Sequence, residues 1–461
     1  MIFNKPHFIF LLLFALLLLA PFWLSDGMFL DGVFYSCIAR NLSEGIGTYW
    51  EPCFSLVNDR IFHSHPPLQF WLMSWFYKLF GTSIYVERLF ACLIFIGTVW
   101  LIGLNASVLC NKKEPKALAY FAILLWLITP VVFWGYRHSI LDTTMTMFCL
   151  AASYFLIKPK EKQYILDYLL AALFFIFALL TKGIAALFLL GIPVIWIILY
   201  RRHRLKVFIY YCLIFVVIPL IFFLVLFKTV PSARVYFDNY LAKQVFASLA
   251  NENEVTVNHP GSILVKLLSE LIVPIALVLL LFFLNRLSPI KIKSSSKEAL
   301  LFLFVGLSAT LPYLVSLKQH RMYLLAAIPF FILALVHFYQ DYFKYIYEKF
   351  EKAYAAMLRK VNMVLGFLLV PAFIIALFMP LRDKDRLEDV YNLVGTVEPQ
   401  TILGTSHTVA QRWEFSAYMN RLGYLYLDPH KEHELRLIDR QEGLPDNCKV
   451  VSQSTRYTIC R

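Results

Sequence analysis

The chain has 461 residues, of which 60% are hydrophobic and only 16% are charged. Soluble chains are on average about half apolar and about a quarter charged, so this composition excludes an ordinary soluble protein and indicates a polytopic membrane protein. The net charge of +13 is large enough for nucleic-acid binding, but the placement of the basic residues argues against it.

Eleven apolar runs are long enough to cross roughly 30 Å of hydrocarbon. The first lacks a clear small-residue cleavage site and many others follow, so we interpret it as a retained helix rather than a signal peptide. Only Lys182 and Gly183 separate the fifth run from the sixth, which predicts a hairpin turn. The runs cover residues 8–25, 86–109, 117–134, 141–157, 164–181, 184–200, 207–227, 263–284, 299–316, 322–339 and 361–380.

Basic residues are concentrated on one side of the predicted bundle. With a cytoplasmic N-terminus, the five cytoplasmic loops carry 3, 3, 4, 4 and 5 Lys and Arg, and the opposite loops carry 3, 1, 1, 3 and 2. This asymmetry follows the positive-inside rule and predicts a periplasmic C-terminus. The net charge therefore reflects topology and contact with anionic lipid. The last cytoplasmic loop contains a predicted basic interfacial helix, 343–360.

The first outer loop, 26–85, is predicted to contain two helices that lie on the membrane. One begins at Asp31 and places Phe34, Ile38 and Leu42 at helical spacing. The other follows the double proline at 66–67. These elements complete a predicted transmembrane domain, residues 1–380, and the remaining residues, 381–461, form a small periplasmic domain.

The periplasmic tail is predicted to be a small α/β unit. The segments ILGT and YLYL are short strands that flank a helix, a Glu/Arg-rich helix follows, and CKVVSQSTRYTIC forms a hairpin. Cys448 and Cys460 either bridge this hairpin in an oxidising compartment or remain free thiols. For Cys37 and Cys53, in the first outer loop, the same two possibilities stay open, namely a disulfide or two free thiols.

Several motifs between about residues 26 and 340 resemble those of a known protein family. The resemblance depends on their order along the chain and on the side of the membrane where each is predicted to lie. Asp31 ends the first span and precedes a Tyr-x-x-Ile-Ala-Arg helix, a Pro-Pro-Leu helix and Glu87-Arg88. Further motifs are Arg137–Asp142 at the opening of the fourth span, Thr181-Lys182-Gly183, and Pro312…Ser316-x-Lys318…Tyr323-Leu324-Leu325…Pro329. This set resembles the GT-C glycosyltransferases, in particular the group of aminoarabinose transferases and protein O-mannosyltransferases. The tail shows no such resemblance.

Two positions depart from the pattern of that group. Gly32 stands where the group often has a second acidic residue, and His65 stands where aminoarabinose transferases carry a lysine. Protein O-mannosyltransferases and many bacterial relatives do have His-Pro-Pro-Leu at this place. The resemblance therefore implies the reaction class without fixing the sugar.

The resemblance implies an integral-membrane enzyme of the bacterial inner membrane that takes a sugar from a polyprenyl-phosphate carrier. The expected acceptor is a lipid such as lipid A, a cell-envelope glycan or a protein. The acceptor hydroxyl requires a base, for which Asp31 is the candidate, and a single displacement would invert the anomeric centre. Asp142 is a second catalytic candidate that orients the acceptor or a cation. The leaving phosphate requires stabilisation, for which the candidates are His65, Arg137, Lys182, Lys318 and Arg321.

Each candidate also has a structural interpretation. Asp31 and Asp142 are first-turn residues that the helix dipole favours, and Arg137 and Lys182 are suited to anchoring at the membrane surface. Gln244 is interpreted as structural. His63, His65 and His259 are weak candidates for a metal site, so a divalent metal stays open and no other cofactor is expected. The rival functions are a transporter or flippase of lipid-linked sugars and a non-catalytic envelope scaffold.

Overall fold

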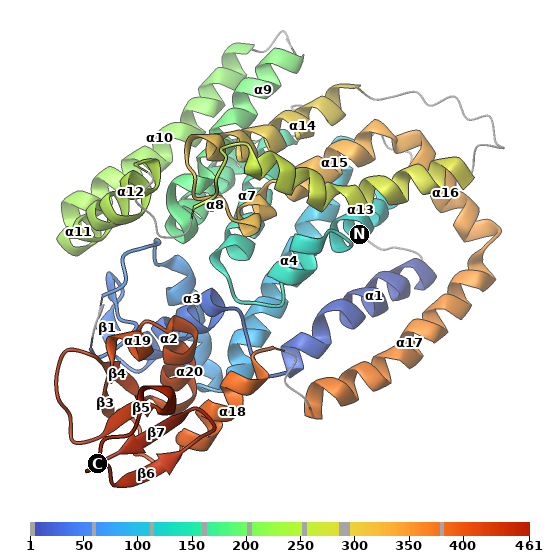
Figure 1. Ribbon diagram of the computed structural model, residues 1–461. Helices are drawn as coiled ribbons and strands as arrows, with labels where there is room; N and C mark the ends of the chain where they lie inside the picture. The colour runs from blue at the N-terminus through green and yellow to red at the C-terminus, as the bar shows by residue number, and fades with distance from the viewer. Residues whose placement is uncertain are drawn as a thin grey trace.

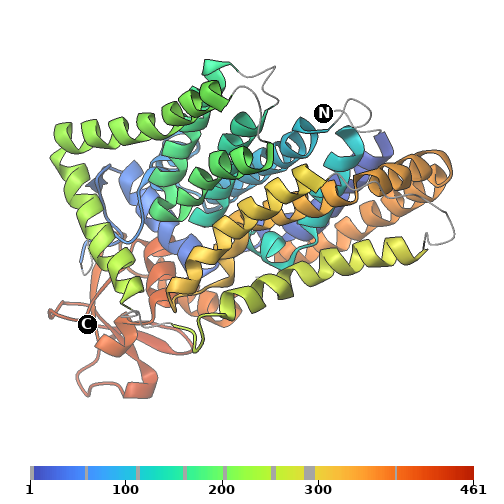
Figure 2. The ribbon, with the colours of Figure 1, turned by 90° about the horizontal axis from the view of Figure 1, so that it is seen from above.

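The computed structural model describes residues 5–57, 61–110, 115–158, 164–200, 205–250, 256–284, 296–378 and 382–461. A bundle of long helices carries a small β-sheet domain at one end, where it lies against α2 and α3 (Figures 1 and 2). Helices α1 (Lys5–Leu24) and α17 (Ala355–Phe378) run side by side at one edge, although most of the chain separates them. Most of the predicted basic loops at 111–116, 157–163, 201–206 and 285–297 lie outside the described residues.

Within the described ranges, seven helical stretches are long and apolar enough to cross a membrane. Three shorter apolar helices accompany them: α5 (Pro115–Leu127), α7 (Leu141–Ile157) and α15 (Ile328–Phe338). Each of the eleven predicted runs overlaps one of these segments, so the polytopic helical class is confirmed, while the number of crossings stays a prediction. The seven stretches are α1, α4 (Ile84–Val108), α8 to α9 (Ile165–Tyr200), α10 (Leu205–Thr229), α13 (Ser262–Leu284), α14 (Ser296–Thr310) with its following turn, and α17.

Several predicted runs are broken where the sequence places proline or glycine. The run 117–134 divides into α5 and α6 (Pro130–Gly135), since Pro130 has no N–H to continue the first helix. Helix α8 (Ile165–Lys182) ends at Gly183, whose φ of +63° leaves the helical region. The chain then turns back as a 3₁₀ segment, η2 (Gly183–Leu190), and α9 (Gly191–Tyr200), which contact α7. This geometry agrees with the predicted hairpin.

The predicted interfacial helix at 343–360 is wrong in its extent. The structure has α16 (Gln340–Lys352), and a turn at 353–354 separates it from α17. Residues 355–360 therefore belong to the next long helix. The apolar side of α16, which includes Phe343 and Ile346, is buried and the helix contacts α5.

Helix α2 (Leu30–Ser43), predicted to lie on the membrane, has its apolar face covered by protein rather than free to contact lipid. It is buried between α3 (Leu68–Phe80) and α20 (Trp413–Gly423) of the tail. Arg40 is fully buried there and donates to the carbonyl oxygens of Asn420 and Arg421 at the end of α20. The predicted apolar face of α2 is real, but the tail covers it. Helix α3 keeps an exposed apolar edge, which includes Trp75 and Phe80.

The tail forms a five-stranded mixed sheet with strand order β4-β3-β5-β7-β6. Strand β3 pairs in parallel with β4 and β5, and β7 pairs antiparallel with β5 and β6. The predicted Glu/Arg-rich helix is wrong, because its residues form β5 and a single 3₁₀ turn, η6 (Arg440–Glu442), and β5 occupies the centre of the sheet. The strands are β3 (Ile402–Thr405), β4 (Tyr426–Asp428), β5 (Arg436–Asp439), β6 (Val450–Gln453) and β7 (Tyr457–Cys460), and two helices, α18 (Lys384–Leu393) and α19 (His407–Ala410), join α20.

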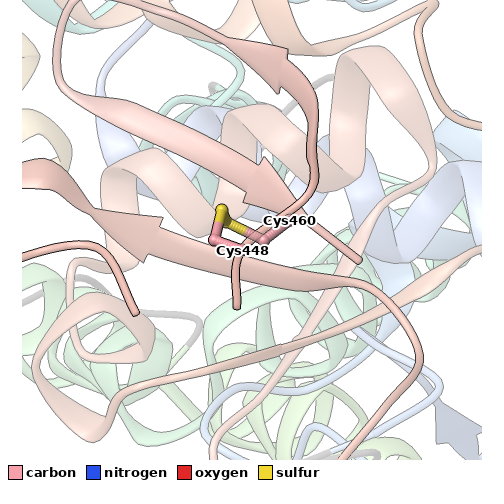
Figure 3. Close-up of a disulfide and its surroundings, with 2 residues drawn as sticks. All are labelled: Cys448 and Cys460. Carbon is pink, nitrogen blue, oxygen red and sulfur yellow. A yellow bond between two sulfur atoms is a disulfide. The ribbon is translucent and has the colours of Figure 1, made fainter. Parts of the chain in front are cut away.

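A disulfide joins Cys448 and Cys460 across the predicted hairpin (Figure 3). Of the two alternatives for this pair, the structure has the bridged one. Cys37 and Cys53 are buried free thiols, so the other pairing does not form. The disulfide ties the segment before β6 to the last strand, and Arg461 and Lys449 add a reciprocal pair of backbone hydrogen bonds beside it.

A buried ion pair fixes the tail to the helical bundle. Arg421 of α20 contacts Glu87 of α4 at 2.7 Å, and both side chains are almost completely buried. Arg421 also donates to the carbonyl oxygen of Thr82, and the Tyr77 hydroxyl donates to Glu87. Because burying charges is favourable only when they are paired and hydrogen-bonded, this cluster fixes one orientation of the tail on the bundle. The predicted boundary between two domains at residue 380 stays a prediction.

Candidate active site

Two adjoining cavities share part of their walls, and the first of them lies where the helical bundle meets the tail. The first, here called the polar cavity, has a volume of about 760 Å³ and is lined by Asp31, His65, Lys182 and Lys318. The second, the apolar cavity, has a volume of about 450 Å³ and a wall that includes Leu187, Phe188 and Leu249. The residues shared by the two cavities are His65, Lys182, Gln244, Lys318 and Tyr323. Four predicted site residues, far apart in the sequence, are therefore brought to one place.

Asp31 lies in the first turn of α2 on the wall of the polar cavity. Burial raises the pKa of this carboxyl group to about 6; Lys182 and Lys318 oppose the change, and Asp142 adds to it. The hydroxyl of Tyr35, one helical turn later, hydrogen-bonds the carboxylate. A carboxylate with a pKa in this range is ionised at neutral pH yet basic enough to accept a proton.

Lys182, which lines the polar cavity, forms a buried ion pair with Asp142. Lys182 is the last residue of α8, Asp142 is in the first turn of α7, and their side chains are in direct contact. The Lys182 ammonium also lies 4.8 Å from the ring centre of Tyr323. The pairing holds a cation in a partly apolar environment, where an unpaired charge would be costly.

Lys318 is presented by a loop that one glutamine organises. The side chain of Gln319 donates to the carbonyl oxygens of Pro260, Tyr313 and Ser316 and accepts from the backbone N–H of Ile263. These bonds position the loop, and the Lys318 ammonium reaches Gln244 at 3.3 Å. Burial lowers the pKa of Lys318, while the nearby Asp31 carboxylate raises it.

His65 differs in its charge from Lys182 and Lys318, the two lysines that also line both cavities. Burial, with Lys182 and Lys318 close by, holds the pKa of its imidazole well below the usual range. The ring is therefore neutral at physiological pH and offers a hydrogen bond rather than a positive charge. Tyr236 of α11 (Pro231–Tyr240) donates to the carbonyl oxygen of His65 and so fixes the segment that precedes α3.

The remaining predicted site residues lie elsewhere. Arg321 contacts Glu270 at 3.4 Å and lines neither cavity. Arg137 donates to the carbonyl oxygen of Leu18 and stacks on Phe22, which fixes α1. Both interactions hold neighbouring segments together, and neither arginine side chain lines the polar cavity.

The three histidines proposed as metal ligands do not meet. His63 lines the polar cavity beside His65, but His259 is exposed and accepts a hydrogen bond from the backbone of Gly261. No group of three His, Cys, Asp or Glu side chains suited to a metal ion occurs in the part of the chain that the structure describes. These three residues therefore do not fit a shared metal site.

Among the lining residues that were not predicted as site residues, Tyr35, Gln244 and Trp413 stand out. Tyr35 follows Asp31 by one helical turn, a spacing that the sequence does contain. Gln244 was interpreted as structural, yet it lines both cavities from a π-helical turn, η3 (Leu241–Phe246). Such turns are frequent at functional sites, but their sequence carries no clear signal. Trp413 comes from the tail, and no motif connects it with Asp31.

The fold and parts of the sequence are similar to known proteins. Residues 64–227, less than half of the chain, match the family model for dolichyl-phosphate-mannose-protein mannosyltransferase. The structure of ArnT from Cupriavidus metallidurans, solved with undecaprenyl phosphate, superposes with a TM-score of 0.67 and 14% identity, covering 98% of this chain and 97% of that one. The chain has the ArnT fold. The ArnT-like region includes the tail, which showed no sequence resemblance.

Two further comparisons are more distant or shorter. The undecaprenyl phosphate-alpha-4-amino-4-deoxy-L-arabinose arabinosyl transferase of Shewanella sediminis is 26% identical over 196 residues, which are 42% of this chain. The match spans about a third (35%) of that protein's length. The Archaeoglobus fulgidus oligosaccharyltransferase, solved with Zn and sulfate, has a TM-score of 0.51 and 12% identity over 93% of this chain and 62% of that one. These similarities confirm the predicted resemblance to the group of aminoarabinose transferases and protein O-mannosyltransferases.

Proposed function

We propose that the protein is a glycosyltransferase of the bacterial inner membrane that moves a sugar from a polyprenyl-phosphate carrier to an acceptor hydroxyl at the periplasmic face. The observation that carries this proposal is the wall shared by the two cavities, where Lys182 and Lys318 separate an apolar space from one that contains Asp31. A lipid-linked phosphate has the matching order of parts, namely an apolar chain, an anion and a sugar. The similarity in fold to ArnT, which binds undecaprenyl phosphate, supports the same donor class.

The donor is expected to bind across the shared wall. Its polyprenyl chain would occupy the apolar cavity against Leu187 and Phe188, and its phosphate would lie at Lys182 and Lys318. His65, being neutral, would donate a hydrogen bond to the phosphate without adding charge. The sugar would then extend into the polar cavity, towards Asp31.

Transfer would proceed as a single displacement. Asp31 accepts the proton of the acceptor hydroxyl while the acceptor oxygen forms a bond to the anomeric carbon. The bond from that carbon to the phosphate oxygen breaks at the same time, and the polyprenyl phosphate leaves with both bonding electrons. Lys182 and Lys318 stabilise the charge that develops on the phosphate, and the anomeric configuration inverts.

Asp142 acts as a positioning residue in this proposal rather than as a base. Its carboxylate is buried against Lys182, so it has no free path to an acceptor proton. The pair instead keeps the Lys182 ammonium in place before the donor binds, which reduces the rearrangement needed during transfer.

Replacement of Asp31 by Asn tests the proposed base. Asn keeps the size of the side chain but cannot accept the proton, so transfer from an undecaprenyl-phosphate sugar is expected to fall by about 100-fold or more. Asp26→Asn is the matched control, because Asp26 is a nearby carboxylate that accepts a hydrogen bond from Tyr391 and lines neither cavity.

The same assay separates the rival functions. Transfer by Asp31→Asn within a few-fold of the wild-type rate would refute Asp31 as the base. Wild-type protein that moves lipid-linked sugar across a vesicle membrane without transferring it to any acceptor would favour the transporter.

A further inference from the structure

A third cavity, here called the tail cavity, opens between α2 and the tail. It has a volume of about 730 Å³, within the usual range for ligand sites. Leu30 and Trp413 line both the tail cavity and the polar cavity, so the two spaces meet at these residues. Leu30 directly precedes Asp31, and the tail cavity therefore adjoins the polar cavity close to the proposed base.

Trp413 occupies the junction of these cavities. It is the first residue of α20 and is 41% exposed, although it is a large apolar side chain. Its ring contacts Phe34 with 6.4 Å between ring centres, and Phe34 lies on α2 three residues after Asp31. An exposed indole held in this way is a ready surface for a flat apolar face of a ligand.

The charges of the tail cavity are balanced and largely paired. Its wall contains four acidic and four basic residues. Arg386 contacts Glu414 at 2.9 Å and Asp383 at 3.1 Å. Such a wall has no excess of positive charge to attract an anion, but it offers many fixed hydrogen-bond donors and acceptors.

The buried carboxylate of Asp439 holds the other two arginines of this wall. Arg412 contacts it at 2.6 Å and Arg456 at 3.0 Å, and Asp439 itself is fully buried. The guanidinium groups are therefore ordered before any ligand binds, which lowers the entropy that binding must overcome.

We propose that the tail cavity binds the uncharged, hydroxyl-rich part of a glycan acceptor, with one sugar ring against Trp413. Sugar rings combine an apolar C–H face, which suits the indole, with hydroxyl groups, which suit the paired arginines and carboxylates. A sugar at Trp413 would direct the next hydroxyl of the chain towards Asp31. This inference rests on the proposed function and narrows its acceptor to carbohydrate, whether free or attached to a lipid.

Glycan binding can be measured without catalysis. Purified protein in nanodiscs is applied to an array of neutral and phosphorylated bacterial oligosaccharides. We expect wild-type protein to bind neutral glycans, Trp413→Ala to bind them about tenfold more weakly, and Trp413→Phe to bind within a few-fold of wild type. Trp75→Ala is the control, since Trp75 is similarly exposed on α3 but lines neither the polar nor the tail cavity. Equal binding by Trp413→Ala, a requirement for phosphate groups, or no binding of any glycan would overturn the inference.

Kinetics distinguish this inference from the proposed function. A glycan that bound wild-type protein on the array then serves as the acceptor. With this acceptor, Trp413→Ala is expected to raise the acceptor KM about tenfold. Hydrolysis of the undecaprenyl-phosphate sugar without acceptor should fall less than transfer does, because the variant leaves the two lysines proposed to bind the donor phosphate unchanged. An equal loss of both activities would place Trp413 in the donor site and overturn the inference. Failure of wild-type protein to cleave the donor would instead contradict the proposed function, while glycan binding would still stand.

Discussion

Asp31 combines a low-polarity environment with two nearby lysines, and the balance sets its pKa at about 6. If this carboxylate is the base, kcat/KM must follow its ionised fraction. The rate is expected to be nearly constant just above pH 7 and to be about tenfold lower at pH 5. Burial lowers the pKa of Lys318, so a second loss is expected at alkaline pH, below the ordinary range of lysine. Transfer rates measured from pH 5 to 10 at constant ionic strength check both limbs, and a flat profile between pH 5 and 7 would contradict the assignment.

The raised pKa of Asp31 has different consequences for catalysis and for folding stability. A carboxyl group whose pKa is raised on folding contributes stability at a pH below its unfolded value of about 4, and this contribution is lost as the pH rises through 6. At pH 7.5 the ionised Asp31 is therefore unfavourable for folding. The variant Asp31→Asn should consequently melt no lower than wild type at this pH while losing transfer. A lower melting temperature would indicate a structural role.

Part of the site could be predicted from single residues and part could not. Asp31, His65, Lys182 and Lys318 belong to motifs whose order resembles a known group, so their meeting was foreseeable. The pairing of Lys182 with Asp142 joins residues 40 positions apart on two helices, and no local pattern encodes it. The neutral state of His65 depends on burial and on two lysines from other segments, which only the fold brings together.

At the scale of elements, Gly183 determines how α8 ends and where Lys182 points. Its φ is +63°, and a Cβ at this position would overlap the hydroxyl of Tyr240. The variant Gly183→Ala is therefore expected to lose about 2 kcal/mol or more of stability and most of the transfer activity. Gly366→Ala on α17 is the control, because it is helical and a Cβ there meets nothing within 4 Å. Thermal unfolding and transfer assays of both variants check this, and equal behaviour would show that the turn tolerates a side chain.

The positions of the helices were easier to predict from the sequence than the elements that pack against them. Over the described residues, each apolar run coincides for most of its length with helical structure, because its length and hydropathy suffice to indicate a membrane helix. The amphipathic pattern of α2 was also recognised, but such a pattern does not tell whether lipid or protein covers its apolar face. In the structure the covering element is α20, more than 360 residues later in the chain. Strand β5 was missed because its alternating burial depends on neighbouring strands rather than on helical propensity.

At the scale of the whole molecule, the tail is a wall of the site rather than an appendage. Trp413 and the tail cavity lie beside Asp31 only while α20 stays on α2 and α4. Arg40 and Arg421 make that contact from buried positions, so docking depends on a few charged hydrogen bonds as well as on apolar area. Loss of one of these bonds should therefore affect transfer although neither arginine lines the polar cavity.

The variant Arg421→Met tests this coupling. This variant leaves the Glu87 carboxylate buried without its partner, and such a change lowers the free energy of unfolding by roughly 3 to 5 kcal/mol. We expect faster proteolysis of the tail, a lower melting temperature and loss of transfer to a glycan. The double variant Glu87→Gln with Arg421→Met removes the unpaired charge and keeps an oxygen that accepts from Tyr77, so it should recover much of the stability. If the double variant is as unstable as Arg421→Met, Arg421 contributes to stability through packing rather than through its charge. If the tail of Arg421→Met resists protease as well as the wild-type tail does, the ion pair does not hold the tail on the bundle.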